Sequence, residues 1–327
     1  MLRPILRPVS ALRVLVWSVI LFAAAGLLAA LRLRGDGRER TPALVVTGAA
    51  FPLRIETPAG ELVLERAPLH ILPAFASAVD FMLDLVPKER VIALPATARE
   101  WSALASEPSD WNALPTLAAF SAEEVLALGP DLILVQAWLG ASTIETLRRK
   151  GEPVLELPLP NDWQGILATL RSLGAVVDAR ERADALIEEL ERRRRVLAER
   201  PGTRLRALCY SNWGSGGTTA GSDSTGDLLL ELAGLANAAR EVGLRGNPSI
   251  DHETILALAP DLFVVATAPV GTHSPSSAYL VDDVHLSALP AIRAGRIVTL
   301  PMHLFSTASH RIIDAAEALA REVDELE

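Results

Sequence analysis

The residue types that most often carry chemistry are sparse in this chain and are not spaced for direct metal binding. Its six histidines include no pair at the i, i+4 spacing that places two ligands on one helical face. The single cysteine, Cys209, adds no ligand cluster and can form no intramolecular disulfide. We therefore predict no protein-held metal ion and no intrinsic cofactor, although a metal could arrive already chelated. The histidines are His70, His252, His273, His285, His303 and His310.

Catalytic motifs are also missing. The glycine-rich stretch GSGGTTAG at 214–221 lacks the Lys-Ser or Lys-Thr ending of a phosphate-binding P-loop, and it does not match the G-x-G-x-x-G dinucleotide fingerprint. No G-x-S-x-G nucleophile elbow occurs in the chain. We predict a binding protein and not an enzyme. The alternatives are an enzyme or a membrane-tethered sensor, either of which would use one cleft in the fold for its ligand.

Aromatic side chains gather where strands are expected to end. Only 5% of the residues are aromatic, yet four of the eight Trp and Tyr residues lie at the ends of predicted strands. Aromatic planes with a few polar tips suit a flat, largely apolar ligand. The predicted ligand-binding residues are Phe75, Trp101, Trp138, Tyr210, Trp213 and His303.

A phrase that occurs twice indicates the elements that would position these residues. SAEEVLALGPDL at 121–132 and DHETILALAPDL at 251–262 each begin with a residue that can cap a helix, Ser121 or Asp251. In both copies a proline follows the helix, and the chain continues into a short apolar run. Such a run is typical of a strand that is buried on both faces of a parallel sheet.

The surroundings of the phrase repeat as well, with strands before each copy and a helix and a further strand after it. We therefore predict an α/β fold of two similar lobes, each a mainly parallel sheet flanked by helices. The lobes are expected at 41–161 and 204–327, joined by a long rigid helix within 162–203. Leu126 and Leu256 are expected on the buried faces of the repeated helices. Ligands in such sheets bind beyond the carboxyl ends of the strands, so the site is expected in the cleft between the lobes.

The first forty residues differ from the rest. Arginines stand before and after the uncharged apolar stretch 14–31, whose length lies between that of a signal-peptide core and that of a membrane span. We interpret 1–40 as a signal peptide or an N-terminal anchor in the inner membrane, which places the remainder in the periplasm or otherwise outside the cytoplasm. The chain has a net charge of −9 although 1–40 is basic, so the remainder is strongly acidic. This charge argues against nucleic acid as a partner.

The two lobes, the connecting helix and the repeated phrase resemble the substrate-binding proteins of ABC importers for iron-siderophore, haem or cobalamin. The resemblance extends from about Leu62 to the C-terminus and includes LPTLAAFSAEE and TTAGSDSTGDLLLELAGLANAA. It implies the class III periplasmic-binding-protein fold and a monomer whose cleft closes only slightly. The implied ligand is a ferric siderophore, haem or cobalamin, and the implied partners are an ABC permease and its ATPase.

The resemblance also bears on which ligand is bound. HLFSTASHRI at 303–312 resembles a segment of cobalamin binders, but Leu304 stands where their tryptophan would stack on the corrin. This difference disfavours cobalamin. Haem binders of the family supply a tyrosine or a histidine as the axial ligand, and the candidates by location are Tyr210, His303 and His310.

The resemblance implies, finally, how the protein meets its transporter. Family members present one carboxylate on the outer rim of each lobe to arginines of the permease. Glu145 follows the third strand of the first lobe, and Asp283 lies in the corresponding region of the second. We expect these two acids to be the docking pair, because each lobe of a duplicated protein would contact one half of a two-fold transporter.

Overall fold

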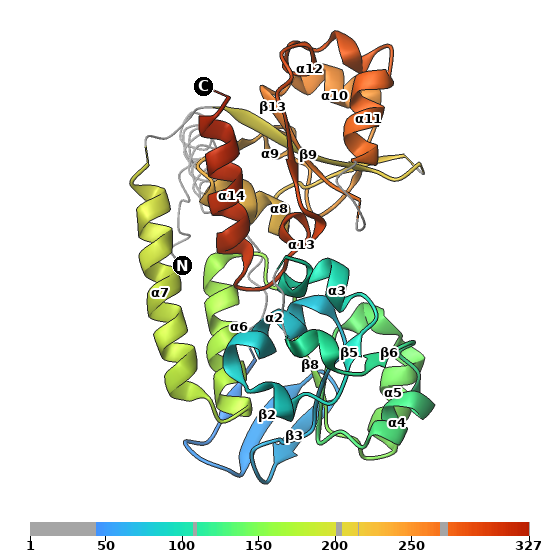
Figure 1. The fold of residues 1–327 in the computed structure, drawn as a ribbon, viewed down its shortest axis with the longest axis vertical. Coiled ribbons are helices and arrows are strands. Elements are labelled where there is room, and N and C mark those ends of the chain that lie inside the picture. The colour runs from blue at the N-terminus through green and yellow to red at the C-terminus, as the bar shows by residue number, and fades with distance from the viewer. Residues whose placement is uncertain (1–43, 107–109, 201–204, 215, 269–273, 327) are drawn as a thin grey trace, which may run out of the picture. The chain divides into compact units, whose positions relative to one another are not determined.

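The computed structural model shows the stretch from Arg40 to Glu327 as one compact unit (Figure 1). The residues that it describes are 44–106, 110–200, 205–214, 216–268 and 274–326. The predicted export or anchoring segment, 1–40, lies outside them. Among the helices of the described ranges, none combines the length and the apolar character needed to cross a membrane.

A three-stranded antiparallel sheet precedes the first lobe, and the sequence interpretation did not predict it. Its order is β1-β2-β3, with strands β1 Val46–Thr47, β2 Leu53–Thr57 and β3 Gly60–Leu64. The stretch LRIETPAGELVL contains the signal, because apolar and polar residues alternate before a Pro-Ala-Gly turn and a short apolar run follows it. Leu53 and Ile55 are fully buried and fix this register.

The first lobe is built on parallel strands. Its central sheet has the order β4-β7-β8, and a parallel pair, β5 with β6, lies beside it. All residues of β4 and β7 are buried, as predicted for strands covered on both faces. The strands are β4 Ile71–Pro73, β5 Leu94–Pro95, β6 Thr116–Leu117, β7 Leu132–Val135 and β8 Val154–Glu156. The helices are α2 Ala76–Leu85, η1 Lys88–Arg90, α3 Ala98–Trp101, η2 Ala103–Ala105, η3 Asp110–Ala113, α4 Ala122–Leu128, η4 Ala137–Leu139 and α5 Ala141–Arg149.

The second lobe contains a six-stranded sheet of order β12-β10-β9-β13-β14, with β11 paired to β9. The pairs of β9 with β11 and β13, and of β13 with β14, are parallel, whereas β10 and β12 pair antiparallel. The strands are β9 Arg206–Asn212, β10 Gly217–Thr219, β11 Ala236–Asn237, β12 Ser249–Ile250, β13 Leu262–Ala266 and β14 Ile297–Leu300. The helices are α8 Thr225–Leu232, α9 Ala238–Glu241, α10 His252–Leu258, α11 Pro275–Asp282, η5 Leu286–Ala288, α12 Pro290–Arg293, α13 Met302–Phe305 and α14 Ile312–Asp324. The predicted α/β fold of two mainly parallel lobes is confirmed.

The repeated phrase forms the predicted capped helix and strand in each lobe. The Ser121 hydroxyl accepts a hydrogen bond from the backbone N–H of Glu124 at 3.2 Å, and Asp251 accepts one from Thr254 at 2.8 Å. The prediction for the buried face was wrong, because each helix has only two turns and buries one narrow stripe. Val125 and its counterpart Ile255 are fully buried on that stripe. The next residue in each copy is rotated by about 100°, so that Leu126 is half-buried and Leu256 is exposed.

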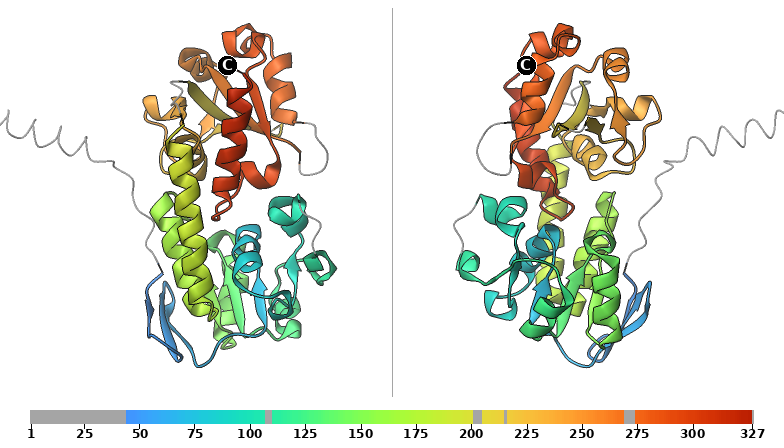
Figure 2. Two further views of the ribbon diagram at one scale, coloured as in Figure 1. Left: turned by 60° about the vertical axis from the view of Figure 1, so that its left-hand side comes forward. Right: turned by 90° about the vertical axis from the view of Figure 1, so that its right-hand side faces the viewer.

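The connection between the lobes differs from the single helix predicted within 162–203. It consists of two helices, α6 Trp163–Val176 and α7 Arg180–Ala198, which lie side by side in Figures 1 and 2. The chain reverses at Asp178, whose φ of 55° lies in the left-handed region. A Cβ atom on Gly174 would lie 2.4 Å from the Cβ atom of Ala183, so this glycine permits the close packing of the pair. The connector proper is therefore α7, about 28 Å long at the usual helical rise.

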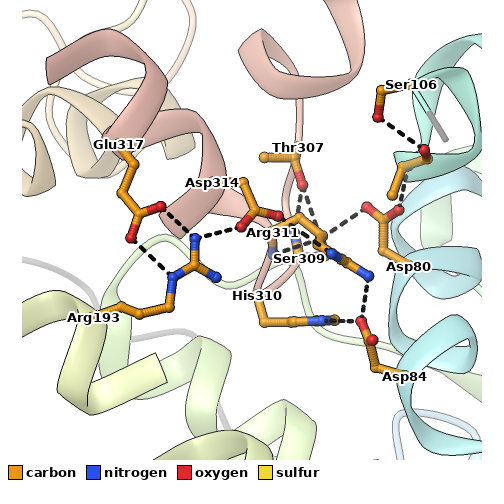
Figure 3. A network of polar contacts seen from close by, with 11 residues as sticks. Asp80, Asp84, Ser106, Arg193, Thr307, Ser309, His310, Arg311, Asp314 and Glu317 are labelled. Carbon is orange, nitrogen blue, oxygen red and sulfur yellow. Dashed lines mark hydrogen bonds and ion pairs between the residues drawn. The ribbon is translucent and has the colours of Figure 1, made fainter. Parts of the chain in front are cut away.

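A polar network joins helix α2 of the first lobe to the segment between α13 and α14 (Figure 3). The Ser309 hydroxyl donates to the Asp80 carboxylate at 2.8 Å, and the backbone N–H of Ala103 donates to its other oxygen at 2.8 Å. One turn further along α2, Asp84 accepts from His310 Nε2 at 2.8 Å and pairs with the Arg311 guanidinium at 2.8 Å. The two carboxylates thus tie α2 to the second lobe.

A second arginine extends this network to the connector. Arg193 of α7 pairs with Asp314 and with Glu317, both on α14, at 2.6 Å each. These hydrogen bonds and charges, which outweigh the opposing effect of burial, hold the pKa of Arg193 above its ordinary value. The connector is therefore fixed to the second lobe by a two-carboxylate clamp as well as by packing.

Candidate functional site

A pocket of about 240 Å³ opens beside the carboxyl-terminal half of β9. Strands β9 and β10, the amino end of α8, the turn before β12 and the end of α13 contribute to it. Its lining residues are Cys209, Ser211, Thr218, Thr219, Ala220, Thr225, Gly226, Asn247, Phe305 and Ser306. All of them belong to the second lobe, although α13 also packs against α3 and η2 of the first.

The alternation of side chains along β9 decides which residues face this pocket. Cys209 and Ser211 line it, so the residue between them must point to the opposite face of the sheet. That residue is Tyr210, which is 1% exposed and packs in the core with Ile250 and Phe263. A Cβ atom on Gly217 would lie 2.6 Å from the Tyr210 ring, which shows how closely the ring is covered. The structure thus places Tyr210 away from the pocket, at the end of the predicted strand but on its other face.

Helix α8 presents its amino end to the pocket. Ser224 caps it by accepting from the backbone N–H of Asp227 at 3.1 Å. A Cβ atom on Gly226 would lie 2.5 Å from the Cβ atom of Ala220, so this glycine lets the helix approach β10 closely and brings Thr225 to the pocket wall. The buried Asp227 carboxylate pairs with Arg240 at 2.9 Å. A negative charge therefore already complements the positive end of this helix.

Cys209 is buried at the inner wall. Burial, and then the nearby charge of Asp227, raise the pKa of its thiol to about 12. The thiol is therefore protonated at neutral pH, and it is the thiolate that attacks electrophiles and binds metals. Within the described residues, no group of three or more His, Cys, Asp and Glu side chains is arranged to hold a metal ion.

The predicted tryptophans lie in different settings. Trp213, just beyond β9, is 49% exposed, and its Nε1 donates to the Ser211 hydroxyl at 2.8 Å, which connects it to the pocket wall. Trp138, in η4 after β7, is 69% exposed and donates to the Gln136 side chain at 2.6 Å. Trp101, at the end of α3, is half-buried. Both lobes therefore offer an aromatic surface just beyond a parallel strand. Of the three tryptophans, Trp213 is the one that a hydrogen bond within the described residues links to the pocket wall.

Other predicted residues lie outside the pocket. Phe75 is 4% exposed and packs in the core of the first lobe, where it precedes α2. His310 is 2% exposed and is held by Asp84, so the structure encloses this candidate axial ligand. His303 lines a separate pocket of about 260 Å³, together with Leu304, on another side of α13.

The short helix α13 thus lies between two pockets. Leu304 lines the second pocket, whereas Phe305 lines the first. The residue whose identity disfavours cobalamin therefore does not line the pocket at β9. Sequence reasoning missed Phe305, Thr225 and Asn247. A signal was present for Thr225, which opens an apolar helical run after a Ser-Asp-Ser turn.

The two predicted docking acids also differ. Glu145 lies on α5 with its side chain 61% exposed, and only a long contact of 3.9 Å links it to Arg149. Asp283 accepts from the backbone N–H groups of His285 and Leu286 at 2.9 Å each, and these bonds hold the pKa of its carboxyl below the ordinary value. Asp283 therefore has a local role in holding the turn that leads from α11 into η5, whereas Glu145 remains open to a partner.

This fold and pocket define a two-lobed α/β binding protein. Residues 77–304 match the model of a family described as periplasmic binding protein. The chain belongs to this family, whose members are binding proteins and not enzymes. The prediction of a binding protein is confirmed.

Individual relatives carry more specific descriptions. A cobalamin-binding protein of Halobacterium salinarum is 22% identical over 269 residues, which is 79% of this chain and 70% of the relative. An Fe3+-hydroxamate transport protein of Saccharomonospora viridis superposes with a TM-score of 0.70 at 20% identity, covering 84% of this chain and 99% of that one. The periplasmic haem-binding protein HutB of Vibrio cholerae gives a TM-score of 0.67 at 21% identity, covering 78% and 98%. At these identities the solved structures establish the shared fold.

Proposed function

We propose that this protein is the extracytoplasmic solute-binding component of an ABC importer, which captures a metal chelate and delivers it to a permease. The ligand would be a ferric siderophore, haem or cobalamin, the three kinds named among the relatives. Membership of the periplasmic binding protein family supports the general role. The predicted export or anchoring segment at 1–40 would keep the protein outside the cytoplasm.

The observation that carries the proposal is the pocket beside β9. It lies near the carboxyl ends of parallel strands, where open α/β sheets bind their ligands. Phe305 and the nearby Trp213 provide aromatic surface, and the described wall contains no carboxylate, histidine or lysine that could act as a general base. A volume of about 240 Å³ is smaller than a whole chelate, so the ligand would place one edge in this pocket and its remainder against the facing lobe.

Loading experiments test this function. The full chain, purified in mild detergent, is expected to bind at least one of cyanocobalamin, a ferric siderophore or haemin, with quenching of its tryptophan fluorescence. Replacement of both Trp138 and Trp213 by alanine should weaken binding at least about fivefold, because stacked aromatic contacts contribute about 1 kcal/mol each. Val196→Ala, on the exposed side of α7, is the control and should bind normally. Failure of all three chelate classes to bind would disprove the proposed function.

Docking to a permease gives a second test. Glu145→Lys is expected to slow association with the permease and to weaken its salt dependence, since exposed charges mainly influence the rate of encounter. Ligand affinity should not change. Asp283→Lys is the contrasting variant, because loss of the hydrogen bonds that hold the turn before η5 should also lower stability by about 1 kcal/mol. Unaltered association kinetics in Glu145→Lys would exclude Glu145 from the docking surface.

A further inference from the structure

The wall of the pocket beside β9 has an unusual composition for a protein with 22% charged residues. Each of the ten described residues that line it is uncharged. Six of them carry a hydroxyl or an amide group: Ser211, Thr218, Thr219, Thr225, Asn247 and Ser306. The pocket therefore combines hydrogen-bonding capacity with an absence of ionised side chains in its described wall.

Two of these hydroxyl groups already donate their proton to the backbone and can therefore only accept a hydrogen bond from a ligand. The hydroxyl of Thr219 donates to the carbonyl of Cys209 at 2.7 Å, and that of Ser306 donates to the carbonyl of Met302 at 2.7 Å. Each hydroxyl has one proton, so the oxygens of Thr219 and Ser306 can only accept from a ligand.

Other groups can donate. The Ser211 hydroxyl accepts from Trp213 and retains its own proton. Within the described residues, no protein group satisfies the Thr225 hydroxyl or the Asn247 side-chain amide, both of which line the pocket. An amide offers two N–H donors and an acceptor oxygen, so the wall can recognise carbonyl, hydroxyl and amide groups alike.

The charges nearest in sequence to these residues are already paired. Arg240 pairs with the buried Asp227 at 2.9 Å, and Arg245, two residues before Asn247, pairs with Asp223 at 2.6 Å. Neither guanidinium lines the pocket. An ionised group entering it would lose hydration without gaining a cation, which is costly, whereas a neutral polar group would exchange water for wall hydroxyls.

We propose that this pocket selects metal chelates whose periphery is uncharged and built from amides, carbonyls and hydroxyls, over chelates that carry ionised carboxylates or catecholates. Ferric trihydroxamates such as ferrichrome and the amide-edged corrin ring of cobalamin present such neutral groups, whereas haem has two propionates and ferric tricatecholates carry several negative charges. Cobalamin also has one phosphodiester in its nucleotide loop, so it would enter the pocket by its corrin edge. The inference rests on the function proposed above and narrows its ligand class.

Affinities for four probes test the selection in the full chain: cyanocobalamin, ferrichrome, haemin and ferric enterobactin. One of the first two should bind at least a hundredfold more tightly than either of the last two. Its affinity should change less than about threefold between 0.05 and 0.5 M NaCl, because no charge pair is formed. The neutral probe that binds more tightly shows whether the natural ligand is a corrinoid or a ferric trihydroxamate.

Substitutions at Thr225 test whether the preference for neutral chelates arises in this pocket. Thr225→Val removes the hydroxyl at nearly constant shape and should weaken the preferred neutral chelate about fivefold to tenfold. Thr225→Lys should raise the ratio of the affinity for an anionic chelate to the affinity for the preferred neutral chelate about tenfold or more. Thr143→Val, on α5 of the other lobe, is the matched control and should leave both affinities unchanged.

The outcomes separate the two proposals. Tighter binding of haemin or ferric enterobactin by the unmodified protein would overturn the neutral-ligand inference while leaving the importer function in place. Unchanged selectivity in both Thr225 variants would overturn it as well, because the pocket would then not hold the ligand. Absence of binding by every probe would overturn the importer function and with it this inference.

Discussion

Asp84→Asn is expected to lower the free energy of unfolding by roughly 2 kcal/mol at pH 7. The carboxylate of Asp84 holds both His310 and Arg311, and removing one partner of such a group leaves the others uncompensated. Its side chain is 28% exposed, so the loss should be smaller than for a fully buried ion pair. Burial alone would raise the pKa of Asp84, but the His310 hydrogen bond and the charges of His310 and Arg311 hold it below the ordinary value.

Asp80→Asn, one helical turn away, is expected to have the opposite effect. Burial raises the pKa of Asp80 to about 6, against hydrogen bonds from Ala103 and Ser309 that favour its ionised form. The native protein therefore loses stability from this group as the pH rises from its unfolded pKa of 3.8 through about 6. Without a charge, the asparagine oxygen can accept from the backbone N–H of Ala103, and its NH2 group can donate to the Ser309 hydroxyl, which then donates to Thr307. The variant should gain about 1–2 kcal/mol at pH 7.5 and almost nothing at pH 4.

Urea unfolding of the three proteins at pH 4, 5, 6 and 7.5 measures both effects. The two substitutions are chemically identical and lie on the same helix, so each serves as the control for the other. Asp84 contributes its stability above its unfolded pKa, and this contribution disappears as the pH falls through the depressed folded pKa. If the free energy of unfolding changed with pH in the same way in both variants, the two carboxylates would not differ in pKa as described.

Gly221→Ala is expected to destabilise the second lobe by about 1–3 kcal/mol, the usual cost of overpacking. An added Cβ atom would lie 2.3 Å from the carbonyl oxygen of Leu244 and 2.6 Å from the backbone nitrogen of Arg245. Backbone atoms cannot rotate away as a side chain can. The N–H of Gly221 also donates to the carbonyl of Gly246 at 2.8 Å, which holds the two segments together. The substitution should therefore displace the turn that carries Asn247 to the pocket.

The midpoint of urea unfolding measures this cost, and Gly165→Ala provides the control. Gly165 lies in α6, where an added Cβ atom would meet side chains and no backbone: Pro160 at 3.3 Å and Asp162 at 3.6 Å. Helix propensity favours alanine over glycine by about 1 kcal/mol, which should offset that contact. A Gly221→Ala protein as stable as the Gly165→Ala protein would contradict the close backbone packing at Gly221.

The architecture could be predicted because its signals are local. Ser121 and Asp251 cap their helices through contacts three residues away, and the apolar runs after them form buried parallel strands. The left-handed turn at Asp178 has only a weak signal, since aspartate adopts this conformation occasionally and neither glycine nor proline marks the turn. The helical pattern across 162–200 is therefore interrupted near Asp178, whereas the long connecting helix that was predicted is present as α7.

The site was harder to predict because it depends on side-chain direction. A strand end places neighbouring residues on opposite faces, so the predicted Tyr210 lies one position away from Cys209 and Ser211, which line the pocket, and on the other face of the sheet. In α13 the same one-residue difference separates Leu304 from Phe305. Asn247 lies on a turn with no periodic pattern, and only the folded lobe brings it to Thr225.

The protonated thiol of Cys209 has a consequence for the cargo. A ferric or cobalt chelate bound as proposed would sit beside sulfur, which binds metals as a thiolate. At a pKa of about 12 the sulfur keeps its proton and forms no metal–thiolate bond at neutral pH. Such a chelate would then leave the pocket with the same ligands and oxidation state with which it entered.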